Sequence, residues 1–174
     1  WITNWVDGTV MGVDTAALTV TSTIDLNGPL AASGLLGANV TGRRGLAHPR
    51  SIAITNNKAG GDEDETLLVT EYFAQRSAPL ADKGANADGD HSGVVYSINN
   101  TTKAVTLIKL APIADMGFKD SAGGVAGCFP NQLQSITVNG TFAYVTSICA
   151  SPKGPIGATG DSPPKLDNIK TTTH

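Results

Sequence analysis

The chain has 174 residues, a length typical of one ordinary domain, and a formal net charge of −3. Only 16% of the residues are charged and 40% are hydrophobic, and 20 glycines accompany many Thr, Ser and Asn residues, so the composition favours strands and turns over helices. The acidic balance excludes the electrostatic signature of a nucleic-acid-binding protein, and no apolar run approaches the roughly 20 residues of a membrane span.

The first predicted elements are strands in residues 1–26, joined by a polar turn at residues 14–17. Four more strands are predicted near residues 50–55, 66–72, 93–99 and 104–110. In the third of these, hydrophobic side chains occupy every second position, which is the period of a pleated strand. The last predicted pair, residues 132–138 and 141–148, flanks Asn139-Gly140, the dipeptide that most strongly indicates a two-residue hairpin turn.

The register of this last hairpin makes a prediction about the two cysteines. With Asn139-Gly140 as the turn, Cys149 faces Pro130, which is two residues from Cys128. A disulfide needs Cα atoms about 5.5–6 Å apart, so we expect Cys128 and Cys149 to close the open end of the hairpin, in preference to two free thiols. A disulfide in turn predicts an oxidising location, which is the periplasm, the cell surface or the medium.

The predicted strands repeat along the chain. The segment WITN at residues 1–4 recurs as LVTE at residues 68–71 and as YVTS at residues 144–147. Each recurrence belongs to a set of strands in the same order, and four consecutive antiparallel strands are the unit of a β-propeller blade. The pattern resembles the YVTN-type repeat family of β-propellers.

The resemblance implies an all-β fold, a β-propeller of four-stranded antiparallel blades of which only part of the ring is present. Residues 1–26 would be the end of one blade, 48–110 a full blade, and 129–148 the first half of a further blade, followed by a Pro-rich loop at 149–174. A closed ring has about four to eight blades. We therefore expect the remaining blades of the same protein, or other subunits, as partners.

Four connections between the predicted strands are long, at residues 27–47, 73–92, 111–129 and 149–174. In a propeller of this family all four would emerge on one face. Connections longer than about 12–15 residues are usually functional or disordered. We therefore expect a docking surface for a protein partner on this face, with drift in tolerant loops as the alternative.

Three histidines, His48, His91 and His174, lie at the ends of these long loops. Imidazole is the commonest neutral metal ligand, so one hypothesis is a shared site for copper, zinc or iron. The other is that each histidine caps a turn. Residues 82–90 are rich in oxygen side chains, and Asp88 and Asp90 would either help to wrap Ca²⁺ or lie in a solvated turn.

Two functions follow from these patterns. The favoured one is an extracytoplasmic β-propeller that binds or scaffolds through the loops on one face. The alternative is the propeller part of a periplasmic or secreted oxidoreductase that depends on a metal or another cofactor. The sequence assigns no residue a catalytic role and leaves open whether the protein is an enzyme.

Overall fold

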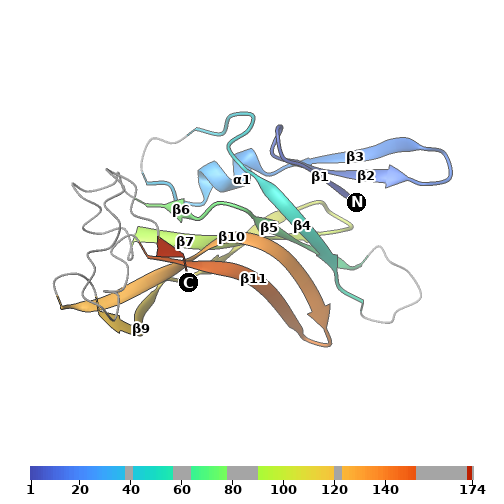
Figure 1. Cartoon of the computed structure of the whole chain (residues 1–174). Coiled ribbons are helices and arrows are strands. Elements are labelled where there is room, and N and C mark those ends of the chain that lie inside the picture. Colours follow the sequence, from blue (N-terminus) through green and yellow to red (C-terminus); the bar gives the residue numbers. More distant parts are fainter. Residues whose placement is uncertain (38–40, 57–63, 78–89, 120–122, 152–171, 174) are drawn as a thin grey trace.

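The structure is a computed structural model, and it describes residues 1–37, 41–56, 64–77, 90–119, 123–151 and 172–173 (Figure 1). These residues form antiparallel sheets with a single short helix, so the chain is all-β as expected. No helix in these ranges is long and apolar enough to cross a membrane.

The first sheet contains β1 (Ile2–Asn4), β2 (Thr9–Asp14) and β3 (Thr19–Asp25) in that order. The predicted turn between β2 and β3 is fixed by its first residue, because the Asp14 carboxylate accepts the N–H groups of Ala16 and Ala17 at 2.8 and 2.9 Å. A helix that the sequence did not predict, α1 (Asn27–Ala32), follows β3 inside the first long connection.

The central sheet contains the four predicted strands, now β4 (Pro49–Ile54), β5 (Thr66–Glu71), β7 (His91–Asn99) and β8 (Val105–Leu110). They pair in the order β4-β5-β7-β8, each antiparallel to the next. A short extra strand, β6 (Gln75–Arg76), pairs with the first residues of β7 beyond the end of β5.

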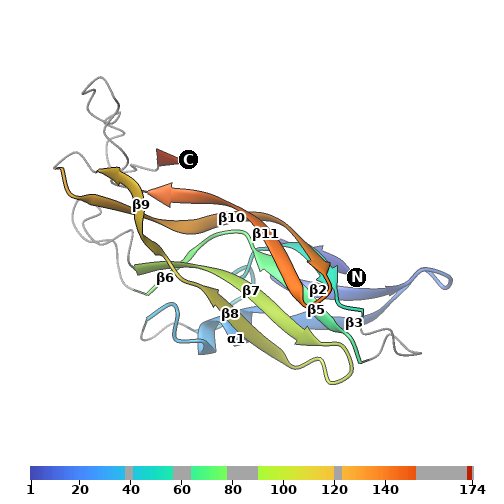
Figure 2. The same ribbon diagram turned by 90° about the horizontal axis from the view of Figure 1, so that it is seen from below.

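The third sheet contains β9 (Ile113–Lys119), β10 (Val125–Asn139), β11 (Phe142–Ser151) and β12 (Thr172–Thr173). They pair in the order β9-β10-β11-β12 (Figure 2). Much of the predicted loop 111–129 is therefore a hairpin of β9 with an extended β10, which the sequence did not indicate.

The predicted turn of the β10–β11 hairpin is wrong by one residue. Asn139 pairs with Phe142, so the turn residues are Gly140 and Thr141. Gly140 has φ +60°, and glycine at the first central position suits a hairpin turn of the II′ kind. The register shifts between Asn131 and Ser135, and this irregularity restores the predicted pairing of Pro130 with Cys149.

The three sheets lie face to face with the central sheet between two separate hydrophobic cores. The core toward the first sheet contains Val10, Ile24, Leu26, Leu30, Ala47, Leu67, Val69, Val94, Tyr96 and Ile98. The core toward the third sheet contains Leu68, Val95, Leu133 and Ile136. Successive side chains of β5 and β7 enter opposite cores, because neighbouring residues of a strand point to opposite faces.

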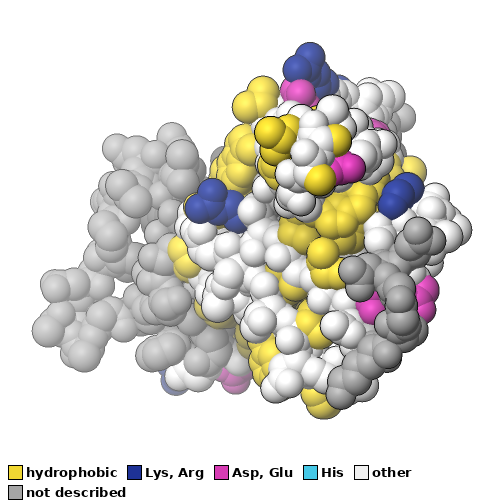
Figure 3. Space-filling model, turned by 90° about the vertical axis from the view of Figure 1, so that its right-hand side faces the viewer, with side chains coloured by type: hydrophobic (Ala, Val, Ile, Leu, Met, Phe, Trp, Pro, Cys, Tyr) yellow, Lys and Arg dark blue, Asp and Glu magenta, His cyan; other side chains and the backbone are white. Residues whose placement is uncertain are grey.

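The start of β7, the hairpin of β9 with β10 and the end of β11 lie at one end of the stack, on the left of Figure 1. At this end Trp5 contacts His48 and Tyr72, and Gly93 lies against Pro130. We call it the loop end, defined by these five residues. The β2–β3, β7–β8 and β10–β11 turns lie at the opposite end, on the right of Figure 1. On this side, the described residues show hydrophobic and uncharged side chains with a few Lys, Arg, Asp and Glu between them (Figure 3).

Candidate functional site

The loop end contains a hollow of about 590 Å³. Its wall comes from the segment before β4, from the bend that carries β5 into β6, and from the first residue of β7. The side chains that give it chemical character are Arg43, His48, Phe73, Gln75, Arg76 and His91. Among the described residues that line it there are two arginines and no Asp or Glu, so this part of its wall is cationic.

The two arginines of the hollow have no carboxylate partner among the described residues. Arg43 and Arg76 are both exposed. Near the hollow, Arg44 forms an ion pair with Asp7, and the rings of His91 and His48 lie next to the carboxyl groups of Asp90 and Glu71. The guanidinium groups of Arg43 and Arg76 therefore keep their donors for water or for a ligand.

His48 precedes β4 and forms part of the floor of the hollow. Its ring packs edge-on against Trp5 and Phe73, with ring centroids 5.2 and 5.1 Å away. Its Nδ1 atom is buried without a hydrogen bond and lies 3.5 Å from Glu71 Oε1. Burial lowers the pKa of the His48 imidazole and so favours its neutral form, although the backbone of Leu46 opposes the shift.

Glu71, the last residue of β5, is fully buried behind this wall. Its carboxylate accepts the Tyr96 hydroxyl at 2.7 Å, the His48 backbone N–H at 2.8 Å and the Gln75 amide at 3.3 Å. Burial raises the pKa of the Glu71 carboxyl to about 7, although hydrogen bonds from Tyr96 and from the backbone of His48 oppose the rise. Burial therefore favours the uncharged form of both side chains, the protonated Glu71 carboxyl and the unprotonated His48 ring. It thus opposes an ion pair between them.

Sequence reasoning did not select Glu71. It stands at the fourth position of the repeated segment, where the other copies have Asn4 and Ser147. The signal that could have indicated Glu71 is its place at the end of a largely apolar strand. A carboxylate buried there requires hydrogen-bonding partners. Arg43 and Arg76 were missed as well, since their position in one hollow depends on β6.

His91 begins β7 on the opposite side of the hollow. Its ring is stacked on Phe129, with centroids 4.4 Å apart and planes 16° from parallel, and its Nδ1 lies 2.7 Å from Asp90 Oδ1. Arg76 pairs with His91 in the β6–β7 ladder, and the Ser77 N–H donates to the Asp90 carbonyl at 2.9 Å. Strand pairing therefore holds Arg76 and His91 in fixed relative positions.

The structure brings part of the predicted metal set together. His48 and His91 line the same hollow, but their Nδ1 atoms lie next to different carboxylates, those of Glu71 and Asp90. Within the part of the chain that the structure describes, no three His, Cys, Asp or Glu side chains are grouped so as to hold a metal ion. His174 and Asp88 lie outside the described residues, so a transition-metal or Ca²⁺ site that includes them stays a prediction.

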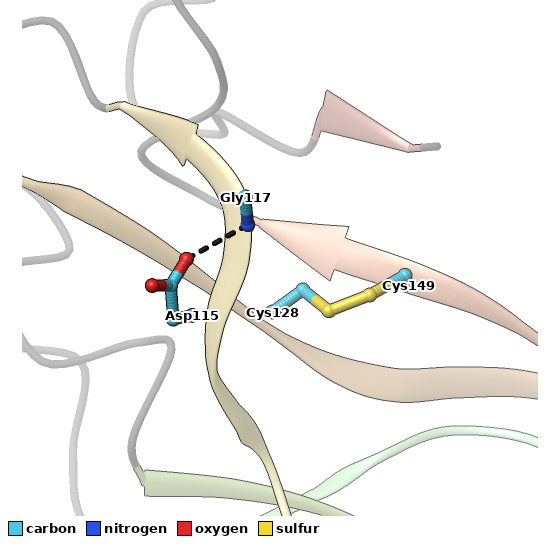
Figure 4. The surroundings of a disulfide bond; sticks show 4 residues. All are labelled: Asp115, Gly117, Cys128 and Cys149. Atoms are coloured by element: carbon cyan, nitrogen blue, oxygen red, sulfur yellow. Dashed lines mark hydrogen bonds between the residues drawn. A yellow bond between two sulfur atoms is a disulfide. The ribbon is translucent and has the colours of Figure 1, made fainter.

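The two cysteines form the expected disulfide, between β10 and β11 (Figure 4). The Cα atoms of Cys128 and Cys149 are 5.4 Å apart. Cys128 is fully buried, and the next residue is Phe129, on which the His91 ring is stacked. The disulfide therefore anchors the side of the third sheet that supports the hollow. In Figure 4 β9 passes beside this bond, with the Asp115 carboxylate accepting the Gly117 N–H at 2.7 Å.

Asn27 fixes the segment that carries His48. This buried side chain accepts the N–H groups of Leu46 and Ala47 at 2.8 and 3.0 Å. Its amide donates to the Asp7 carbonyl at 2.8 Å and to Asp25 Oδ1 at 2.7 Å. One asparagine thus ties the β1–β2 connection and the start of α1 to the edge of the hollow.

Comparisons with protein-family models, with curated proteins and with solved structures found no match to the chain.

Proposed function

We propose that this chain is part of an extracytoplasmic β-propeller that holds a ligand at its loop end. Support for the propeller comes from three antiparallel sheets stacked face to face in chain order. The central sheet is a four-strand meander with a core on each side, which is the packing that a blade between two neighbours requires. The disulfide supports a location outside the cytoplasm.

The outer faces of the stack support further blades as partners. On β11, Phe142 and Tyr144 are 67% and 56% exposed, and on β3 Val20 is 57% exposed. These side chains lie on the first and third sheets, away from the two cores. We expect them to be covered by the remaining blades of the same protein or by other subunits.

The hollow at the loop end is the observation that carries the binding function. Ligand sites are concave and combine apolar walls with a few convergent polar groups. Here Phe73 supplies an apolar surface, and Arg43 and Arg76 supply donors without an acidic partner in the described residues. A protein partner on the surrounding loops remains a prediction. No specific observation favours the oxidoreductase alternative. Of the three histidines in its predicted metal site, His48 and His91 line the hollow, and His174 lies outside the described residues.

The binding function can be tested by NMR on the isotope-labelled full chain. We expect mixtures of neutral, cationic and anionic fragments to shift the backbone amides of Leu46, Gln75 and Arg76, which line the hollow. The amides of Thr102 and Gly140, at the turn end, serve as the internal control. Shifts that are absent, or that are as large at the turn end as in the hollow, would contradict a ligand site at the loop end.

A further inference from the structure

We propose that the ligand of the hollow is a small organic anion whose carboxylate or phosphate group is bound by Arg43 and Arg76. This inference rests on the binding function proposed above and adds the chemical class of the ligand. It is carried by the charge of the wall, by the placement of the two arginines and by the size of the hollow.

The charge of the wall opposes the charge of the chain. The whole sequence has a net charge of −3, yet the described residues that line the hollow include two arginines and no Asp or Glu. Arg44, the neighbour of Arg43, is already paired with Asp7. A guanidinium group presents a planar fork of N–H donors that fits the two oxygens of a carboxylate or phosphate.

The two arginines come from two different segments that line the hollow. Arg76 belongs to β6 and is held by pairing with His91. Arg43 belongs to a turn closed by the Leu46 N–H, which donates to the Arg43 carbonyl at 3.1 Å, and Asn27 fixes Leu46 in turn. The backbones that carry both charges are therefore positioned before a ligand arrives, which reduces the entropy lost on binding.

The remaining wall favours an organic body on the anion. Phe73 is 42% exposed, and Leu36 and Leu46 contribute further apolar surface. The volume of about 590 Å³ falls within the range of roughly 300–1,000 Å³ that small-molecule sites occupy. A bare inorganic ion would leave most of this surface uncovered.

Calorimetric titration of the full chain with matched aromatic probes tests the inference. The probes are benzoate, phenyl phosphate, neutral benzamide and inorganic phosphate. We expect benzoate or phenyl phosphate, whichever carries the preferred group, to bind at least about tenfold more tightly than benzamide and inorganic phosphate, and to weaken as salt is added. Preference for benzoate identifies a carboxylate site, and preference for phenyl phosphate identifies a phosphate site.

Variants link this preference to the two arginines. Arg43→Ala and Arg76→Ala should each weaken the preferred anion about tenfold, and Arg76→Lys should retain part of the affinity because the charge remains without the fork. Arg50→Ala removes an exposed charge from β4 outside the hollow and should change affinity less than about twofold. Thermal unfolding of each variant verifies that it is folded.

The outcomes separate this inference from the binding function. The anion site is wrong if benzamide binds as tightly as the anions, or if the anions bind the alanine variants with unchanged affinity. In either case the NMR shifts still decide whether the hollow binds a ligand at all. If inorganic phosphate alone binds, the organic body is wrong. If no probe binds and no fragment shifts the amides of the hollow, both proposals fail.

Discussion

Glu71 is the buried acid of the loop end, and its surroundings predict a pH dependence of stability. Its pKa is about 7 in the folded chain, against an ordinary value of 4.5. The folded state therefore binds a proton more tightly than the unfolded state. The stabilisation from this proton is complete below pH 4.5 and is lost as the pH rises through about 7.

Glu71→Gln should remove this dependence. Between about pH 5 and 7.5 we expect the free energy of unfolding of the native chain to fall by roughly 1–3 kcal/mol relative to that of the variant, measured by urea unfolding. The lowered pKa of His48 acts with the opposite sign in both proteins, which is why the difference between them is compared. Parallel profiles for the two proteins would show that Glu71 titrates normally.

Among individual residues, the sequence predicted those positions in the fold that depend on neighbours along the chain. His48 and His91 were predicted at strand ends, and the pairing of Cys149 with Pro130 was predicted from a hairpin whose turn is one residue off and whose register an irregularity restores. Arg43 and Arg76 could not be predicted to line the same hollow, because their positions depend on β6 and on the turn held by Asn27. Such contacts join residues distant in sequence, on which local patterns carry no information.

At the scale of elements, the β10–β11 hairpin depends on its disulfide. The bond closes a loop with a sequence separation of 21 residues at the end next to Phe129. Replacing both cysteines, as Cys128→Ala with Cys149→Ala, should lower the free energy of unfolding by about 3 kcal/mol, because the unfolded chain gains conformational freedom. Urea unfolding with and without reductant measures the change.

The double variant provides its own control. Reductant should destabilise the native chain by a similar amount and leave the double variant unaffected. If the oxidised chain and the double variant are equally stable, the disulfide adds no stability beyond that of the hydrogen bonds between β10 and β11.

The predicted elements were most accurate in the central sheet, where β5 and β7 are buried on both faces. The four central strands match their predictions closely, because β5 and β7 supply apolar side chains to two cores. The β9 strand and the start of β10 were missed, since Gly123, Gly124 and Gly127 there are typical of a loop. The turn of the last hairpin was misplaced because Asn-Gly favours one turn type, whereas here Gly140 takes the first central position.

At the scale of the whole molecule, the exposed outer faces predict association. Phe142 and Tyr144 lie 6.5 Å apart by ring centroid on the outside of the third sheet. We expect the isolated chain to self-associate with rising concentration in sedimentation experiments, because large apolar side chains are exposed on these faces. Phe142→Ser combined with Tyr144→Ser should reduce the association.

Val6→Ser is the matched control for this association. Val6 is 73% exposed in the β1–β2 connection, away from the outer face of the third sheet, so its loss should leave association unchanged. A monomeric native chain over the whole concentration range would contradict the proposal that further blades cover these faces.

The separation of the two cores has a consequence for how the chain unfolds. No residue belongs to both cores, and the central sheet alone contacts each of them. The free energy of unfolding is then close to the sum of two contributions, one from the packing at each core. Repeat proteins, whose units interact only with their neighbours, behave in this way. We therefore expect the first sheet to open locally while the second core stays intact, so that amide hydrogen exchange is faster in the outer sheets than in the central one.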